Sequence, residues 1–157
     1  METKLNAAFT IRPAEARDLA SIAAIETASL PWAARWSSDS YLPAPDGVRF
    51  ACVAELEGRI VGFLMARLAV RELEILNLAV APGARRSGVG RALVRAALEA
   101  AAAQGATGVF LEVRESNAAA LAFYDRLGFA VTGRRHGYYR EPDESAVLMS
   151  RALPPGL

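Results

Sequence analysis

Short runs of alternating apolar and polar residues open the chain and predict a strand followed by a helix. Residues 9–12 alternate and end at Pro13, which favours an edge strand because proline cannot donate to a sheet ladder. The next apolar residues recur at helical spacing, and Pro31 lies at or just beyond the end of that helix. They are Leu19, Ile22, Ala23 and Ile25. Residues 32–47 have no clear period, and we expect a short helix or a loop there.

A hairpin and a buried strand are predicted next. Residues 50–55 and 59–65 are typical strands, and Glu57-Gly58 between them is a typical hairpin turn. Residues 73–80 are almost continuously apolar, so we expect a strand that is buried on both faces. A turn at residues 81–83 follows this strand.

The second half of the chain alternates helices with strands. We expect a helix at 90–104, closed by Gly105, with one apolar stripe formed by Leu93, Ala96, Ala97 and Ala100. A strand at 109–113 leads to a short helix at 118–127, which Asn117 caps and Gly128 ends. Late strands are expected at 129–132 and 147–151. This order predicts one mixed α/β domain over residues 1–157, a sandwich around a partly parallel sheet.

Composition narrows the function classes. Hydrophobic residues make up 53% of the chain and charged residues 22%, as in globular proteins, and the formal net charge of +1 argues against a surface dedicated to nucleic acid. One cysteine, Cys52, allows no internal disulfide and suits a reducing, cytoplasmic setting. We expect no secretory signal, no membrane span, no metal site, and a monomer or weak dimer.

The segment from Arg85 to Gly90 has the chemistry of an anion site. It lies between a strand and a helix start, where unpaired backbone N–H groups and the helix dipole favour negative charge. Gly88 and Gly90 allow close approach of a ligand to the backbone, and Arg85, Arg86 and Arg91 add positive charge. A solvated basic turn is the simpler explanation of this segment taken alone.

Two common nucleotide motifs are excluded here. A dinucleotide fold requires a third glycine where Leu93 stands, and a P-loop requires a Gly-Lys-Ser/Thr sequence, which is absent. The pattern Arg-x-x-Gly-x-Gly after an apolar strand resembles instead the acetyl-CoA pyrophosphate motif of the GNAT N-acetyltransferase superfamily.

That resemblance implies a GNAT-type three-layer sandwich in which strand 74–80 splays from its parallel neighbour. It implies that Leu78, Ala79 and Val80 line the acetyl-pantetheine. It also implies that the pyrophosphate is bound by residues of the turn, namely Arg85, Arg86, Ser87, Gly88, Val89, Gly90 and Arg91.

A second constellation is more specific than the glycine turn. Residues 111–129 contain Leu-Glu-Val-Arg, Asn-x-x-Ala and Tyr-x-x-Leu-Gly-Phe, followed by Arg135 and the pair Tyr138-Tyr139. This arrangement resembles the RimI branch of the superfamily, which acetylates the N-terminal alanine of a ribosomal protein. The likeness extends over most of the chain from about residue 72, whereas the N-terminal third resembles only a generic member.

Acetyl transfer to an amine needs a base and an acid. Glu112 can take the proton of an α-ammonium group, whose pKa is about 7.7–8.0. By resemblance, Tyr124 protonates the departing CoA thiolate and Asn117 bonds the pantetheine while capping its helix. Taken singly, a glutamate paired with nearby Arg114, a core tyrosine and a plain cap are the commoner explanations. Their combined spacing favours catalysis.

The acceptor side is less well defined. Trp32, Tyr138 and Tyr139 are candidate substrate contacts, and residues 141–144 are expected to form a solvated turn that could meet a cationic substrate terminus or arginines. The Asp-Ala pair that the resemblance implies at the start of the last strand is replaced by Glu144-Ser145-Ala146, so the aspartate is either missing or displaced to Asp143.

Three functions therefore remain to be compared. The first is acetylation of a protein N-terminus, with a ribosomal protein as the expected partner. The second is acetylation of a small-molecule amine or a lysine, and the third is acyl-CoA binding without catalysis.

Overall fold

The computed structural model describes residues 9–29, 41–44, 48–140 and 143–154. Its strands are β1 (Phe9–Pro13), β2 (Arg49–Leu56), β3 (Arg59–Ala69), β4 (Glu72–Val80), β5 (Gly108–Arg114), β6 (Ala130–Arg140) and β7 (Asp143–Ala152). Its α-helices are α2 (Leu19–Ser29), α3 (Val89–Ala103) and α4 (Ala118–Arg126), and short 3-10 turns occupy Ala16–Asp18 and Pro82–Ala84. Residues 32–40, including Trp32, lie outside the described part of the chain.

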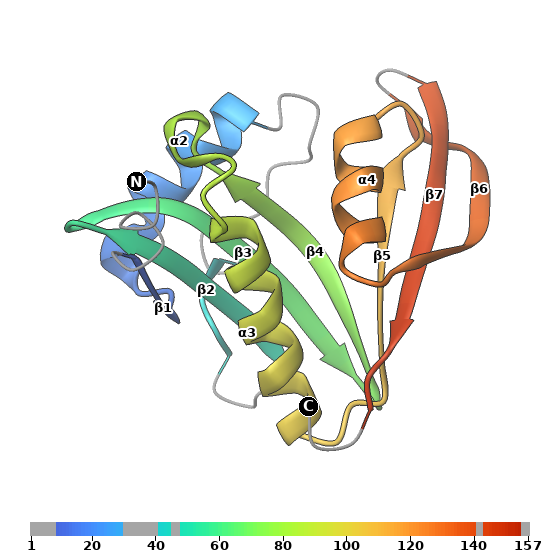
Figure 1. The fold of residues 1–157 in the computed structure, drawn as a ribbon, viewed down its shortest axis with the longest axis horizontal. Coiled ribbons are helices and arrows are strands. Elements are labelled where there is room, and N and C mark those ends of the chain that lie inside the picture. The colour runs from blue at the N-terminus through green and yellow to red at the C-terminus, as the bar shows by residue number, and fades with distance from the viewer. Residues whose placement is uncertain (1–8, 30–40, 45–47, 141–142, 155–157) are drawn as a thin grey trace.

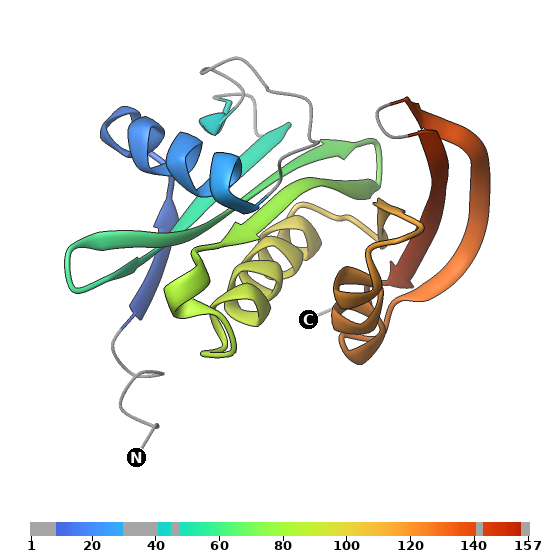
Figure 2. The same cartoon turned by 90° about the horizontal axis from the view of Figure 1, so that it is seen from above.

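The described strands form one sheet in the order β1-β2-β3-β4-β5-β7-β6. All neighbours are antiparallel except β4 and β5, which are parallel. Helix α2 covers one face, and α3 and α4 cover the other (Figures 1 and 2). The expected three-layer α/β sandwich with a partly parallel sheet is confirmed.

The two parallel strands separate partway along their length. Their pairing runs from Glu72 with Gly108 to Ile75 with Leu111. Beyond this point β4 and β5 diverge, as Figure 1 shows. The splay expected from the family resemblance is therefore present, and it begins immediately before Glu112.

A bulge in β4 lies at the point of separation. On the β3 side, Ile75 pairs with Ala66 and Asn77 pairs with Met65, so Leu76 is an extra residue. In a regular strand Ile75 and Ala79 would face the same side of the sheet. The extra residue moves the side chains that follow it to the opposite face, so Ile75 packs in the cluster under α3 and Ala79 packs in the cluster under α2. Helices therefore cover both faces of β4, which accounts for its nearly continuous apolar sequence.

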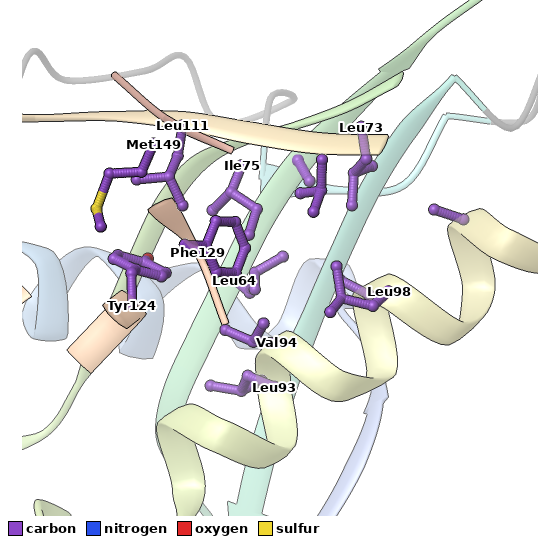
Figure 3. Close-up of a cluster of buried hydrophobic side chains, with 14 of the residues drawn as sticks. Leu64, Leu73, Ile75, Leu93, Val94, Leu98, Leu111, Tyr124, Phe129 and Met149 are labelled. Atoms are coloured by element: carbon purple, nitrogen blue, oxygen red, sulfur yellow. The ribbon is translucent and has the colours of Figure 1, made fainter. Parts of the chain in front are cut away.

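The larger core lies between the sheet and α3 and α4 (Figure 3). Helix α3 buries one stripe toward it, formed by Val89, Leu93, Val94, Ala97, Leu98 and Ala101. The predicted stripe was wrong in part, because Ala96 and Ala100 are only half-buried on its flank. Val94 and Leu98 take the inner positions, since their larger side chains remove more apolar surface from water.

Helix α4 begins and ends as its sequence predicts. The Asn117 side chain accepts a hydrogen bond from the backbone N–H of Ala120 at 3.1 Å. Gly128, with φ of 90°, provides the left-handed residue that ends the helix.

The C-terminal hairpin is longer than its sequence predicts. Strands β6 and β7 extend to Arg140 and from Asp143, so Tyr138 and Tyr139 lie on a strand. The expected solvated turn at 141–144 is wrong for Asp143 and Glu144, which belong to β7, and residues 141–142 lie outside the described chain. The distal half carries arginine and glycine in place of alternating apolar residues, so its strand signal is weak.

Candidate active site

The turn before α3 presents backbone N–H groups at a helix start. Arg86 and Gly88 have φ values of 66° and 89°, which turns the chain sharply into the helix. The Ala92 N–H donates to the Gly88 carbonyl at 3.0 Å. The N–H groups of residues 88–91 precede this bond, so they have no intrahelical acceptor and can bind an anion.

Positive charge surrounds this helix start, but not every predicted ligand offers its side chain. Arg85, Arg86 and Arg91 are exposed, and Arg85 Nε donates to the Val80 carbonyl at 3.2 Å, which fastens the turn to the end of β4. The Ser87 hydroxyl donates to the Ala84 carbonyl. Since Val89 is buried, only its backbone can reach a ligand.

Two glycines set the position of this helix start. A Cβ on Gly90 would lie 3.3 Å from the Phe123 ring of α4, so glycine allows α3 and α4 to meet. A Cβ on Gly62 of β3 would lie 2.9 Å from Val89 Cγ1 and 3.2 Å from the Ala79 carbonyl oxygen. Gly62 therefore allows the N-terminal end of α3 to rest on the sheet.

Replacing Gly62 with valine is expected to destabilise the protein by about 1–3 kcal/mol, because the branched side chain must push Val89 away. It is also expected to weaken the binding of a pyrophosphate ligand, since the start of α3 moves. Chemical denaturation and ligand titration measure the two effects. Gly83→Ala is the matched control, because a Cβ there meets nothing within 4 Å. Equal stability of both variants would contradict the role given to Gly62.

The separated part of β4 has one free edge toward β5. Leu78, Ala79 and Val80 pair with β3 on the other edge. In an antiparallel pair alternate residues direct their N–H and C=O groups outward. The β5-facing groups of residues 77–80 have no β5 partner, and among them the Val80 carbonyl already accepts from Arg85 Nε. They can bond an extended ligand lying between the strands.

Glu112 and Tyr124 lie on opposite faces of the sheet beside this separation. Leu111 and Val113 belong to the cluster that contains Tyr124, so the intervening Glu112 points to the other face. A ligand held between the strands therefore has a carboxylate on one side and a phenol on the other.

The Tyr124 ring is buried in the core. It meets the rings of Phe123 and Phe129 at centroid distances of 5.0 and 5.3 Å, and it belongs to the same buried cluster as Met149 (Figure 3). Its hydroxyl makes no hydrogen bond to a described residue, and no fully buried side-chain oxygen in the described chain lacks a partner. The hydroxyl therefore keeps a small exposed surface. Burial raises the pKa of Tyr124 well above its usual value, so it remains a proton donor.

Glu112 pairs with a different arginine from the one expected. Its Oε2 lies 2.8 Å from Arg135 Nε of β6. Arg114 pairs instead with Glu144 at 3.2 Å. Hydrogen bonds to its carboxylate lower the pKa of Glu144. The bond from the Ser116 backbone N–H has the largest effect, and those from the Ser116 hydroxyl and Arg114 add to it. Glu144 stands in place of the Asp-Ala pair that the resemblance implies. Its contacts with Ser116 and Arg114 hold the turn after β5 against β7.

The two tyrosines of β6 lie close to this carboxylate. Burial raises the pKa of Tyr139, and the charge of Glu112 adds to the shift, which places the phenol near Glu112. The Arg114 guanidinium lies 4.2 Å from the centre of the Tyr139 ring, whereas Tyr138 is 45% exposed. Both tyrosines, predicted as substrate contacts, are thus on the Glu112 face of the hairpin or at its rim.

A buried polar cluster on the same face was not predicted. Glu26 of α2 is 2% exposed, and its Oε2 accepts hydrogen bonds from the Tyr41 hydroxyl at 2.6 Å and the Asn77 amide at 3.0 Å. Asn77 follows the β4 bulge directly. A signal existed in the sequence, because Glu26 continues the apolar helical stripe of Ile22 and Ile25.

Truncation of Glu26 to alanine is expected to destabilise the fold by about 3 kcal/mol, because a buried amide and a buried hydroxyl both lose the side chain that accepts from them. Glu26→Gln, which keeps the shape, is expected to cost less. Urea unfolding measures both, and Glu99→Ala at an exposed helix pair is the control with little expected change. A Glu26→Ala variant as stable as the control would contradict this account.

Cys52 and His136 contribute less to the site. Cys52 lies on β2, and burial raises the pKa of its thiol to about 12, so it is not a nucleophile at neutral pH. His136 is exposed on β6. In the described ranges no three His, Cys, Asp or Glu side chains are grouped for a metal ion. None of the helices that the structure describes is long and apolar enough to cross a membrane.

Comparison with known proteins identifies relatives of this arrangement. The model of the acetyltransferase (GNAT) family matches residues 16–129. The [ribosomal protein bS18]-alanine N-acetyltransferase of Escherichia coli K12 is 38% identical over 99 residues, which are 62% of this chain and 66% of that relative. The chain thus matches slightly less than two thirds of that relative's length.

Solved structures extend the likeness over nearly the whole chain. The crystal structure of the ribosomal-protein-S18-alanine N-acetyltransferase from Escherichia coli has a TM-score of 0.81 and 29% identity, covering 95% of this chain and 96% of that one. That of Ard1 from Thermoplasma volcanium has a TM-score of 0.82 and 31% identity, covering 94% and 99%.

Proposed function

The chain belongs to the GNAT acetyltransferase family, and we propose that it transfers the acetyl group of acetyl-CoA directly to the N-terminal amine of a protein. The observation that carries this proposal is the position of Glu112 and Tyr124 on the two faces of the sheet, beside the point where β4 and β5 separate. A base and an acid are thus available on either side of one ligand position.

The donor side of the molecule fits a pyrophosphate attached to a long polar arm. The N–H groups of residues 88–91 and the exposed Arg86 and Arg91 suit the pyrophosphate. The free edge of β4 at residues 77–80 suits an extended amide chain. The Asn117 amide, whose oxygen caps α4, has its nitrogen left to donate to that chain.

In the proposed reaction Glu112 accepts a proton from the α-ammonium group of the acceptor, directly or through water. The neutral amine then attacks the thioester carbonyl carbon, and the carbon–sulfur bond breaks. Tyr124 donates its hydroxyl proton to the leaving sulfur. A backbone N–H of residues 78–80 can polarise the thioester oxygen, and the alignment of amine and thioester supplies much of the rate.

For the acceptor, we propose an N-terminal alanine of a ribosomal protein in the cytoplasm. The support is the activity of the related [ribosomal protein bS18]-alanine N-acetyltransferase, together with the Glu112–Tyr139 side of the β6–β7 hairpin. Acetylation of a small amine or a lysine is the competing acceptor choice within the same chemistry.

A panel of acceptors tests the proposal. The full-length protein and acetyl-CoA are incubated with a short peptide beginning Ala-Arg, with the same peptide blocked at its N-terminus, and with free amines including lysine. We expect turnover of the free peptide alone. Equal rates on the blocked peptide would refute N-terminal acetylation, and CoA binding without turnover of any amine would indicate a non-catalytic module.

A further inference from the structure

Arg135 is the described side chain that makes an ion pair with Glu112. Arg135 Nε lies 2.8 Å from Glu112 Oε2, and no described residue donates a hydrogen bond to Oε1. The carboxylate is 16% exposed and the guanidinium 56%. One carboxylate oxygen is thus tethered, and the other is left for a proton.

The strand register explains how an arginine two strands away reaches Glu112. Arg135 of β6 and Arg114 of β5 both pair with Ala146 of β7, whereas Glu112 pairs with Leu148. Arg135 therefore crosses β7 diagonally. Ala146 is fully buried and carries only a methyl group, which leaves room for the arginine stem to pass over it.

A second contact restrains the same guanidinium from its other side. Arg135 Cζ lies 5.2 Å from the centre of the Tyr138 ring, within the range of a cation–π interaction. The register between β6 and β7 is irregular between Arg135 and Tyr139, and Gly137 there has φ of 60°. This bulge brings the Tyr138 ring back over Arg135.

We propose that Arg135 is a positioning residue that holds the Glu112 carboxylate in the orientation needed to accept the amine proton; this inference rests on the proposed function. A glutamate side chain has three rotatable bonds, and fixing them in one orientation costs conformational entropy. If a partner already restricts these bonds in the free enzyme, that cost is not paid again at each turnover. A charged partner on a half-buried carboxylate also offsets its desolvation. Arg135 contacts Glu112 and, among the described residues, does not contact those proposed to bind acetyl-CoA. Its removal should therefore change kcat and leave KM for acetyl-CoA unchanged.

Steady-state kinetics of Arg135→Ala tests the inference, with Arg134→Ala as the matched control. Arg134 is the adjacent arginine, and its exposed pair with Glu115 at 2.6 Å lies apart from Glu112. Arg135→Ala is expected to lower kcat about ten- to a hundredfold through misplacement of the base, with KM for acetyl-CoA unchanged. Arg135→Lys, which keeps the charge, is expected to recover part of that loss, and Arg134→Ala to resemble the wild type.

A double-mutant cycle shows whether Arg135 acts through Glu112. In the Glu112→Gln background, Arg135→Ala is expected to cause little further loss of kcat. An equal loss in both backgrounds, or a rate in Arg135→Ala at or above that of the wild type, overturns the inference. If the alanine variant does not fold, Arg135→Gln replaces it in the same cycle. Absence of turnover by the wild type itself would instead refute the proposed function.

Discussion

Glutamine in place of Glu112 is expected to lower kcat by about a hundredfold or more, the usual contribution of a positioned general base. Glutamine has the shape of glutamate but cannot take a proton from the acceptor ammonium. KM for acetyl-CoA is expected to remain near its wild-type value, because Glu112 points to the face opposite α3 and α4. Initial rates at saturating donor measure the effect.

The pH dependence of this loss gives a second readout. An α-amino group with a pKa of about 7.7–8.0 is increasingly neutral as the pH rises above that range, so less deprotonation is required of the enzyme. The deficit of Glu112→Gln is therefore expected to narrow above pH 8. Glu115→Gln, at an exposed neighbouring glutamate, is the control. A fully active Glu112→Gln variant would remove Glu112 from the mechanism.

Phenylalanine in place of Tyr124 is expected to lower kcat by a similar factor, about a hundredfold, through loss of the general acid. The ring contacts with Phe123 and Phe129 are kept, so the stability of the fold is expected to change little. A large loss of kcat with an unchanged unfolding midpoint separates the two roles of this residue. Wild-type turnover by Tyr124→Phe would show that the leaving thiolate needs no proton from it.

The raised pKa of Tyr124 determines how the rate of acetyl transfer should respond to high pH. An ordinary tyrosine ionises near pH 10. Burial raises the pKa of Tyr124, so the neutral, proton-donating form persists above that pH. The wild-type rate is therefore not expected to fall near pH 10 from ionisation of this group, and a fall that disappears in Tyr124→Phe would contradict the assignment.

Local patterns in the sequence were sufficient to predict most of the fold. The alternation of residues 9–12, the Glu57-Gly58 turn and the cap at Asn117 each depend on neighbours within a few positions, and the structure confirms them. The turn before α3 is predicted for the same reason, since glycine spacing and a helix start are both local features.

Features that depend on register were beyond the sequence. The extra residue Leu76 in β4 reverses which side chains meet α2 and α3, yet nothing in its apolar neighbours marks a bulge. The pairing of Glu112 with Arg135 follows from the alignment of three strands, whereas sequence spacing favoured Arg114. Glu26 needed a partner from β4 that lies 51 residues away along the chain.

The donor and acceptor sides of the molecule differ in how well they are defined. The proposed donor side comprises the start of α3 and the edge of β4 at residues 77–80, two elements that the sequence predicts and the structure contains. The proposed acceptor side is the β6–β7 hairpin, where Arg135 pairs with Glu112, Tyr138 lies against Arg135, and Tyr139 is close enough to feel the charge of Glu112. Differences in acceptor choice among family members are therefore expected to follow changes in this hairpin.

Mass spectrometric mapping of the acetylated product is the most direct test of acetyl transfer to a protein N-terminus. A peptide that begins with Ala-Arg and contains an internal lysine is incubated with acetyl-CoA and the wild-type protein, then fragmented to locate the new acetyl group. We expect the acetyl group on the α-nitrogen of alanine, at a rate that falls in Glu112→Gln. Acetyl on the lysine side chain, or none on the peptide, would contradict it.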